Sequence, residues 1–560
     1  MRKACRFSVC IVLIFLTTRW QSCTGDLFLR EHKLGEDYFT SVQSLTYLVT
    51  VENKLLNLLE KHLDFLREID PEFEHDLYAW FGDHLAAVEN PEEYVSHPIT
   101  SYQLIKRLTV DWMDFRSTII EKAPANFTDE LKKEIEPYFP GVSDLNGAVH
   151  GISFLCSVYT MSFADFMQGR FLDRQYDVSL SVFDVLEMTY VSLTNNRIIN
   201  ACLMSIELLY RDDYPVKVLQ ESMGLYESVM KALNATGNYQ MSNGLSNLLY
   251  RKFHNETLPE KPERVMQNEF IGKQRDLLET IQKKEKRTNM MLEEDSREVV
   301  MEDFKRFCAF CKYPNLSRSL LNKSLSCRYK TDLPFLKLSP LKMEELNLDP
   351  LVALFHDAIS DKDIQFLKDA AIPQMQRAVV VNYDKESHQE KGQNYSDSRI
   401  SETAWLNEGD HPVTDVLLDR LNVRIAMMTS RRIMTSESLQ VNNYGLGGYF
   451  APHFDALHYN PGFLKPNNDL DNREATVMFY MSDVEQGGST VFLDLQLVVP
   501  PQKGAALCWY NLKPDRTVDL DTLHGACPVL VGSKWVCNKW IHRFADDHSS
   551  SIPQTALIAS

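Results

Sequence analysis

The sequence predicts a multidomain α+β chain that is helical in its first half and ends in an antiparallel double-sheet, jelly-roll barrel. Apolar residues recur at helical spacing through about residue 250. A charge-dense stretch with little apolar content follows, from Arg251 to Lys305, and reads as a solvated helix or linker. After about Pro340, short β-rich runs are broken by Gly, Pro and Asn. With 560 residues, the chain also exceeds what one hydrophobic core usually supports.

We therefore expect five segments. They are a signal peptide (1–25), an N-terminal helical and dimerisation region (26–142), a helical module (143–250), a charged and cysteine-containing linker (251–340) and a C-terminal domain (341–550).

The N-terminus predicts entry into the secretory pathway. Basic residues precede an apolar run from Phe7 to about Leu16, and small and polar residues follow through Gly25. An apolar run of about ten residues is too short to span a bilayer of roughly 30 Å, so we expect no membrane span. The formal charge of −18 disfavours nucleic acid as the main partner. Sequons for glycosylation occur at Asn126, Asn234, Asn255, Asn315, Asn322 and Asn394.

A heptad-like apolar seam begins the helical region. Its members alternate in steps of three and four, with Glu52 at the one missing place; they are Val42, Leu45, Val49, Leu56, Leu59, Leu63 and Leu66. The seam predicts either a coiled coil or an ordinary amphipathic helix packed on its own domain.

The module at 143–250 predicts packed helices. Ser143 is a candidate N-cap, and Ser162 begins a capping-box pattern. One helical face carries Ala148, Ile152, Leu155 and Tyr159. Further helices are expected at 185–193, 198–209 and 216–233.

Three cysteines within twenty residues suggest a local disulfide in the linker. It would join Cys327 to either Cys308 or Cys311 and leave one thiol spare.

The C-terminal domain is expected to begin with a helix at Asp361 to Ala371, followed by short strands. The clearest strands are at 439–444, 476–481, 490–492 and 505–509.

A candidate metal site comes from His453, Asp455 and His524. Two imidazoles and one carboxylate form the facial set used by non-haem Fe(II) oxygenases. On an extended backbone, residues two apart leave the same face, so His453 and Asp455 can reach one ion. An isolated His-x-Asp pattern is also typical of a hydrogen-bonded surface pair.

The run from Lys534 to His542 puts Lys534, Trp540 and His542 on one face of a strand. A lysine facing into a barrel needs an anionic partner. That partner would be a bound carboxylate or an internal one, for which Asp494, Asp519 and Asp521 are candidates; alternatively, this face of the strand meets solvent.

The C-terminal third resembles the catalytic domain of the collagen prolyl 4-hydroxylase α-subunit family, and the likeness extends more loosely to about Tyr38. The segments that carry the resemblance are 399–406, 439–448, 452–455, 479–484, 487–492, 509–512, 524–529 and 532–536.

The resemblance implies a double-stranded β-helix in which His453, Asp455 and His524 ligate Fe(II). It also implies that Lys534 binds the distal carboxylate of 2-oxoglutarate, which is converted to succinate and CO₂, and that ascorbate rescues oxidised iron. His542 would assist the iron-binding end of 2-oxoglutarate, and Tyr444 is a candidate hydrogen-bond partner for it. Arg399 and Trp405 are candidates for the side that binds peptide.

The same resemblance implies peptidyl-proline 4-hydroxylation in the endoplasmic reticulum lumen, in an α₂β₂ tetramer with protein disulfide isomerase. It implies that the module at 143–250 binds proline-rich or collagen-like peptide. Residues Asn195 to Asn200 stand where the family is rich in tyrosine, so a non-collagen substrate is the alternative. A non-catalytic binding or scaffold subunit is the third possible function. The family's partner for Cys527 is missing, so a rearranged disulfide among Cys508, Cys527 and Cys537 is also considered.

Overall fold

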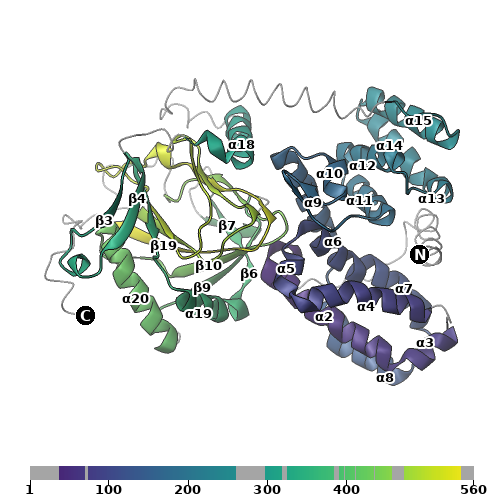
Figure 1. The fold of residues 1–560 in the computed structure, drawn as a ribbon, viewed down its shortest axis with the longest axis horizontal. Helices are drawn as coiled ribbons and strands as arrows, with labels where there is room; N and C mark the ends of the chain where they lie inside the picture. The colour runs from purple at the N-terminus through teal and green to yellow at the C-terminus, as the bar shows by residue number, and fades with distance from the viewer. Residues whose placement is uncertain are drawn as a thin grey trace. The chain divides into compact units, whose positions relative to one another are not determined.

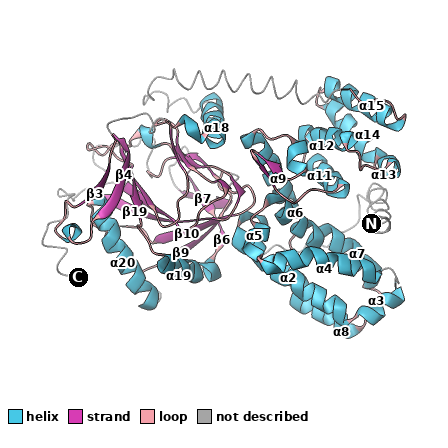
Figure 2. Cartoon of the chain, viewed as in Figure 1, coloured by secondary structure: helices cyan, strands magenta, loops and turns pink. Residues whose placement is uncertain are grey.

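The computed structural model describes residues 37–69, 73–259, 297–317, 325–383, 390–395, 398–409, 412–433, 436–456 and 472–543. The chain forms two compact units, Met1–Phe270 and Ile271–Ser560. In the described residues, the first unit is helical apart from one short hairpin and the second is rich in strands (Figures 1 and 2), which confirms the predicted fold class. The expected signal peptide at 1–25 lies outside the described residues. Within the described part of the chain, no helix is long and apolar enough to cross a membrane.

The first unit is a succession of packed helices. Its principal helices are α2 (Val42–Lys61), α3 (Leu63–Ile69), α4 (Phe73–Glu89), α5 (Pro91–Val95), α6 (Pro98–Lys106), α7 (Trp112–Ile119), α8 (Ala125–Glu130), α9 (Val142–Tyr159), α10 (Phe163–Met167), α11 (Val182–Thr194), α12 (Ile198–Tyr210), α13 (Val216–Glu221), α14 (Met223–Ala235) and α15 (Tyr239–Phe253). The hairpin joins β1 (Arg170–Phe171) to β2 (Arg174–Gln175).

The heptad-like seam is buried inside this unit. Leu45, Leu56 and Leu59 on α2 are fully buried, and the helix ends at Lys61 before the seam is complete. The structure therefore supports an amphipathic helix packed on its own domain rather than a coiled coil.

Glu52, at the missing place of the seam, lies in a buried polar network. Its carboxylate accepts hydrogen bonds from Arg107 Nε at 2.7 Å and Trp80 Nε1 at 2.8 Å. His84 Nδ1 lies 2.8 Å from its second oxygen. The polar residue in the apolar pattern is thus explained by three partners from α4 and from the residues that follow α6.

The helical module follows the predicted pattern with two differences. The predicted inner face, with Ala148 and Ile152 among its members, is buried. However, α9 begins at Val142, because the Asp144 side chain accepts from the Gly141 amide and makes Gly141 the cap instead of Ser143. The helix expected at 216–233 is two helices that meet at Ser222, whose hydroxyl donates to a backbone carbonyl of α13 and competes with helical pairing.

The second unit contains two facing antiparallel sheets. The larger has the strand order β3-β4-β5-β16-β12-β19-β10-β9-β6, and the smaller has β11-β17-β14-β15. The bounds are β3 (Cys327–Lys330), β4 (Leu341–Leu348), β5 (Leu351–His356), β6 (Gln376–Arg377), β9 (Glu402–Leu406), β10 (Leu439–Tyr444), β11 (Phe450–His453), β12 (Asn472–Tyr480), β14 (Thr490–Phe492), β15 (Leu497–Val499), β16 (Ala506–Tyr510), β17 (His524–Ala526) and β19 (Lys534–Arg543). Two further pairs join β7 (Val379–Tyr383) to β8 (Glu390–Tyr395) and β13 (Gln486–Gly487) to β18 (Val529–Val531).

The described residues of this unit also include the α-helices α18 (Arg297–Lys312), α19 (Asp361–Ala371) and α20 (Pro412–Thr429). Helices α19 and α20 cover one face of the larger sheet, where Phe479 and Cys537 join their core (Figure 1). The opposite face shares a second core with the smaller sheet, and Tyr480 and Val536 contribute to it. The alternation along β12 and β19 therefore separates a structural face from an interior face.

The disulfide predictions are wrong. Cys311 on α18 is bonded to Cys527, 216 residues away, whereas Cys308 and Cys327 are free thiols. Closeness in sequence favoured a local bond, but α18 packs on the smaller sheet and brings Cys311 to Cys527 instead. Cys508 and Cys537, which we considered as partners of Cys527, are buried free thiols on the helix-covered face.

Candidate metal centre

The structure brings the three predicted metal ligands together. His453 ends β11 and lies directly opposite His524 on β17 in the antiparallel register. Their ring centroids are 4.4 Å apart. Asp455 follows two residues after His453, and one potential ligand atom from each of the three residues lies within 4.8 Å of the others. This spacing suits a single metal ion.

Backbone carbonyls orient both imidazoles. Nδ1 of His453 lies 2.8 Å from the carbonyl oxygen of Ala451, and Nδ1 of His524 lies 2.9 Å from that of Thr522. A carbonyl only accepts, so each Nδ1 carries the proton and each Nε2 presents its lone pair. Burial and the neighbouring His453 lower the pKa of His524 to about 4, although Asp455 acts in the opposite direction. His524 is therefore neutral at pH 7, as a metal ligand must be.

Asp455 is held by a chain of side-chain hydrogen bonds. Thr476 Oγ1 donates to its Oδ2 at 2.7 Å, and Asn511 Nδ2 donates to Thr476 Oγ1 at 2.9 Å. Burial favours the neutral acid, but His524 and His453 lower the pKa of Asp455 below its ordinary value. The carboxylate is thus ionised and fixed in direction.

Aromatic rings pack against both histidines. Phe450 stacks on His453 at 3.7 Å, and the Arg399 guanidinium lies 4.8 Å from the Phe450 centroid on β11. Trp509 approaches His524 at 4.8 Å from β16. These contacts restrict the rotation of both imidazoles; Asp455 and His524 are buried, and His453 is partly exposed.

Lys534 is fully buried at the start of β19, next to the same interior core. Its ammonium donates to the carbonyl oxygen of Gly488 at 2.6 Å and lies 5.2 Å from the centre of the Tyr444 ring. No ion pair joins it to a carboxylate in the described parts of the chain. Burial lowers its pKa to about 7. An ammonium has three N–H donors, and the structure gives it one neutral acceptor. The remaining donors and the charge suit an anionic ligand.

Two of the three internal partners considered for Lys534 are engaged elsewhere, and none of the three forms an ion pair with it in the described residues. Asp494 pairs with Arg306 at 3.0 Å, and Asp519 caps a short helical turn by accepting from the amide of Asp521. The alternative of a solvent-facing strand is wrong, since both Lys534 and Trp540 are buried.

Tyr444 and His542 occupy different surroundings. Tyr444 is the cross-strand partner of Lys534 and is buried, and its pKa is raised by burial. His542 Nε2 lies 2.7 Å from Glu437, which also pairs with Arg473. Arg473 in turn donates to the backbone oxygen of Asp455 at 3.4 Å. His542 therefore reaches the ligand set through an intervening ion pair.

The two candidates for the peptide side differ in exposure. Arg399 is 7% exposed and donates to Gln440 and Asn442, whereas Trp405 is 39% exposed. The Trp405 ring lies 6.0 Å from that of Trp540. Only Trp405 offers a substantial surface to a partner.

Sequence reasoning missed the groups that hold the ligands. Thr476 could have been found, because it lies on the interior face of the predicted strand at 476–481. The carbonyl of Gly488 and the ion pair of Glu437 with Arg473 depend on contacts between distant strands, which no local pattern reveals.

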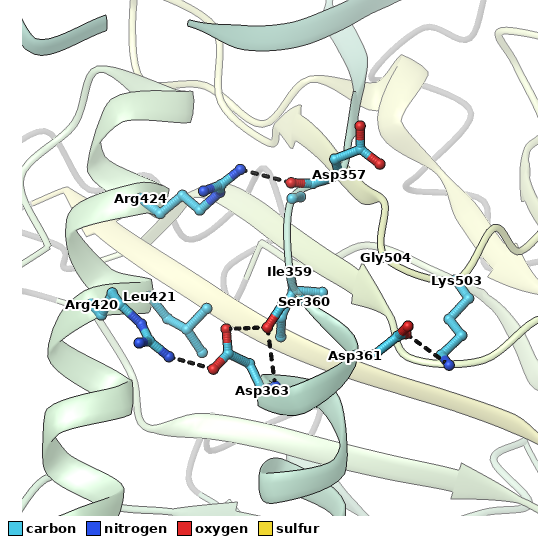
Figure 3. A pocket seen from close by; sticks show the side chains of 11 residues that line it. Asp357, Ile359, Ser360, Asp361, Asp363, Arg420, Leu421, Arg424, Lys503 and Gly504 are labelled. Atoms are coloured by element: carbon cyan, nitrogen blue, oxygen red, sulfur yellow. Dashed lines mark hydrogen bonds and ion pairs between the residues drawn. The ribbon is translucent and has the colours of Figure 1, made fainter. Parts of the chain in front are cut away.

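A pocket of about 580 Å³ lies elsewhere in this unit, between α19 and α20 (Figure 3). Its charges are largely paired with one another, Asp363 with Arg420 and Asp361 with Lys503. None of the predicted site residues lines it. It is therefore separate from the candidate metal centre.

Comparison with known proteins agrees with this geometry. Residues 41–173 match the family described as the prolyl 4-hydroxylase alpha-subunit, N-terminal region, and residues 439–542 match the 2OG-Fe(II) oxygenase superfamily. The chain is 33% identical over 517 residues to prolyl 4-hydroxylase subunit alpha-2 of Caenorhabditis elegans, covering 90% of this chain and 91% of the relative. It is 31% identical over 545 residues to human prolyl 4-hydroxylase subunit alpha-1, covering 93% of this chain and 97% of the relative.

Among solved structures, a similar one is the viral collagen prolyl hydroxylase of Paramecium Bursaria Chlorella virus-1 in its 2-oxoglutarate complex. It is 25% identical, covers 34% of this chain and 95% of its own, and has a TM-score of 0.26. The full-length relatives carry the assignment: the chain belongs to the prolyl 4-hydroxylase alpha-subunit family, and its second unit is an Fe(II)- and 2-oxoglutarate-dependent oxygenase domain.

Proposed function

We propose that this chain is the catalytic alpha subunit of a peptidyl-proline 4-hydroxylase. It would hydroxylate C4 of proline in a proline-rich or collagen-like peptide, with O₂ and 2-oxoglutarate as co-substrates and ascorbate as the reductant that maintains the iron. The relatives named prolyl 4-hydroxylase support the reaction. The observation that carries the proposal is the buried ammonium of Lys534, which lacks a carboxylate partner in the described residues and lies beside the core that packs on His524.

His453, Asp455 and His524 would hold Fe(II) through two Nε2 atoms and one carboxylate oxygen. Iron and 2-oxoglutarate, when bound, supply O₂ activation: one oxygen atom enters the hydroxyl group and the other enters succinate as CO₂ is released. Lys534 would pair with the distal carboxylate of 2-oxoglutarate and fix its orientation. The Tyr444 ring below the ammonium would restrict it further.

His542 would act through Glu437 and Arg473 at the iron-binding end of 2-oxoglutarate. The charge of Arg473 and its hydrogen bond to the Asp455 backbone would hold that loop in place. Trp405 would contact the peptide, and the rings of Phe450 and Trp509 would exclude water from the reacting centre.

We further propose that the chain acts in the endoplasmic reticulum lumen with protein disulfide isomerase as its beta subunit, in an α₂β₂ assembly. The signal-peptide pattern and the disulfide between Cys311 and Cys527 support an oxidising compartment. Exposed sequon asparagines at Asn126, Asn234 and Asn255 support glycosylation. The segments 26–142 and 143–250 would serve dimerisation and peptide binding.

A second candidate substrate is a proline-containing secreted peptide other than collagen. Residues Asn195 and Asn196, at the position where the family is rich in tyrosine, form the turn between α11 and α12. The side-chain amide of Asn195 donates hydrogen bonds to Asn146 and to the backbone carbonyl of Val191. This turn is polar, unlike the tyrosine-rich run of the family.

The test is co-expression with protein disulfide isomerase and an assay of peptide-dependent succinate formation. Collagen-like (Pro-Pro-Gly) repeats and unrelated proline-containing peptides would compete in one reaction. Turnover of the collagen-like repeats supports the first substrate class, and preference for the unrelated peptides supports the second. Binding of iron without peptide-dependent turnover of either kind would contradict the proposed function.

A further inference from the structure

Helix α18 lies outside the two histidine strands and touches the smaller sheet at β11 and β14. The inward side of this helix is buried at Arg306, Phe307 and Phe310. None of its residues is a ligand candidate. It nevertheless packs against Gly525, is bonded to Cys527, and reaches the residue before His524 through Leu493.

The link to the residue before His524 begins at Arg306. Its guanidinium donates to the backbone oxygen of Leu493 at 2.9 Å and to Asp494 at 3.0 Å. The amide of Leu493 donates to the backbone oxygen of Leu523 at 2.9 Å. Arg306 thereby fixes the segment that holds Leu523, the residue immediately before His524.

The contact at the strand itself is made by Phe307. Consecutive residues of β17 point to opposite faces, so Gly525 faces away from the ligand set while His524 faces it. A Cβ atom added to Gly525 would lie 2.9 Å from Cε2 of Phe307 and 3.0 Å from the backbone oxygen of Phe450. The phenyl ring thus lies directly against the back of the ligand-bearing strand.

The contact after His524 is covalent. Cys311 is bonded to Cys527, three residues beyond the ligand, with the Cα atoms 5.5 Å apart. The amide of Cys527 also donates to the backbone oxygen of Ser489 at 2.8 Å. Both ends of β17 are consequently anchored to α18 or to the residues that flank β14, a strand that α18 contacts.

We propose that α18 positions His524 for metal binding, with Arg306, Phe307 and Cys311 as positioning residues. The inference rests on the iron site of the proposed function and extends it to a helix outside the barrel. A metal ligand that can rotate or shift must be ordered on binding, and this lowers the affinity for the ion. Groups that orient metal ligands typically change metal affinity by about 10–100-fold when they are removed.

The test is a Co(II) titration of the full-length chain, produced with its partner subunit, followed by visible absorption. Variants Cys311→Ser and Phe307→Ala should bind Co(II) about 10-fold or more weakly, with an altered absorption spectrum. Phe307→Leu keeps apolar volume behind Gly525 and should recover part of the affinity. Cys327→Ser, which removes an exposed free thiol on β3, is the matched control and should bind as the wild type does.

Near-ultraviolet circular dichroism separates local loosening from loss of the fold. Weaker Co(II) binding by folded variants supports the positioning role. Unchanged affinity in Cys311→Ser and Phe307→Ala, with the wild type binding normally, would overturn it while leaving the proposed function standing. Absence of binding by the wild type would overturn the iron site and the positioning role together.

Discussion

The ammonium nitrogen of Lys534 lies 2.6 Å from the carbonyl oxygen of Gly488, on the loop before β14. This neutral acceptor is the hydrogen-bond partner of an ammonium buried beside the Tyr444 ring. Desolvation lowers the pKa of Lys534 to about 7, because one carbonyl does not replace the water that a charged ammonium loses. Near pH 7, Lys534 without a bound anion is therefore a mixture of the protonated and the neutral form.

Binding of 2-oxoglutarate should depend on pH through Lys534. A dicarboxylate favours the charged ammonium and raises its pKa, so binding above pH 7 takes up a proton. Affinity should fall as pH rises from about 7 toward 10, and calorimetry at pH 8.5 in buffers of different ionisation enthalpy should show the proton uptake. In Lys534→Ala the uptake should vanish and binding should weaken by roughly 2–5 kcal/mol. A pH-independent affinity in the wild type would argue against an ion pair at this position.

The hydroxyl of Thr476 should set the strength of metal binding through Asp455. Thr476→Val removes the hydrogen bond that fixes the carboxylate and should weaken Fe(II) binding by about 10–100-fold. Thr517→Val is a matched control, because it deletes the hydroxyl that donates to Asp515 in a surface turn. Equal metal dissociation constants for the two variants would rule out this orienting role.

The first unit should depend on the pair of Glu52 and Arg107. Arg107→Ala leaves a buried carboxylate without its cation and should destabilise the unit by about 3–5 kcal/mol. Lys61→Ala breaks an exposed pair with Glu130 and should cost at most about 1 kcal/mol. Hydrogen exchange of α2 and α4 in urea measures the loss of stability in both variants. Similar losses in Arg107→Ala and Lys61→Ala would contradict the importance of the buried pair.

Acid should weaken the same unit. Burial raises the pKa of Glu52, but Arg107 and the hydrogen bonds of His84 and Trp80 lower it more, to about 2. A carboxyl group whose pKa is lower in the folded than in the unfolded state stabilises the fold at pH values above its unfolded pKa. For Glu52 that stability is lost as pH falls from about 4.5 toward 2. The pH dependence of unfolding over this window should flatten in Glu52→Gln; an unchanged slope would show that other groups cause it.

Trp405 should affect the peptide and not the co-substrate. Its partly exposed indole beside Trp540 offers a flat apolar surface, so Trp405→Ala should raise the KM for peptide and leave that for 2-oxoglutarate unchanged. Tyr329→Ala, at an exposed tyrosine on β3, should change neither. A parallel rise in both constants for Trp405→Ala would indicate a general packing role.

The sequence predicted much of this architecture because the signals are local. The helix at Asp361–Ala371 and the strands at 439–444 and 490–492 have the predicted bounds. The alternation from Lys534 to His542 also identified the interior face correctly. The candidate ligand set could be named because the segments around it resemble the catalytic domain of a known family, whereas a His-x-Asp pattern alone is also typical of a hydrogen-bonded surface pair.

What the sequence did not show depends on distant contacts. Cys311 meets Cys527 only because α18 crosses the smaller sheet, and spacing along the chain pointed to Cys327 instead. The partnership of His542 with Glu437 spans 105 residues. The seam from Val42 could not be assigned to a coiled coil or to a single packed helix from sequence, because the pattern of a buried amphipathic helix is the same as that of a short coiled coil.

The most direct test is mass spectrometry of a proline-containing peptide after incubation with the assembled enzyme, Fe(II), 2-oxoglutarate and ascorbate. The wild type should produce 4-hydroxyproline and an equal amount of succinate, and His524→Ala should produce neither. Hydroxyproline formed equally by His524→Ala, or succinate formed by the wild type with no hydroxylated proline in any peptide, would contradict the account.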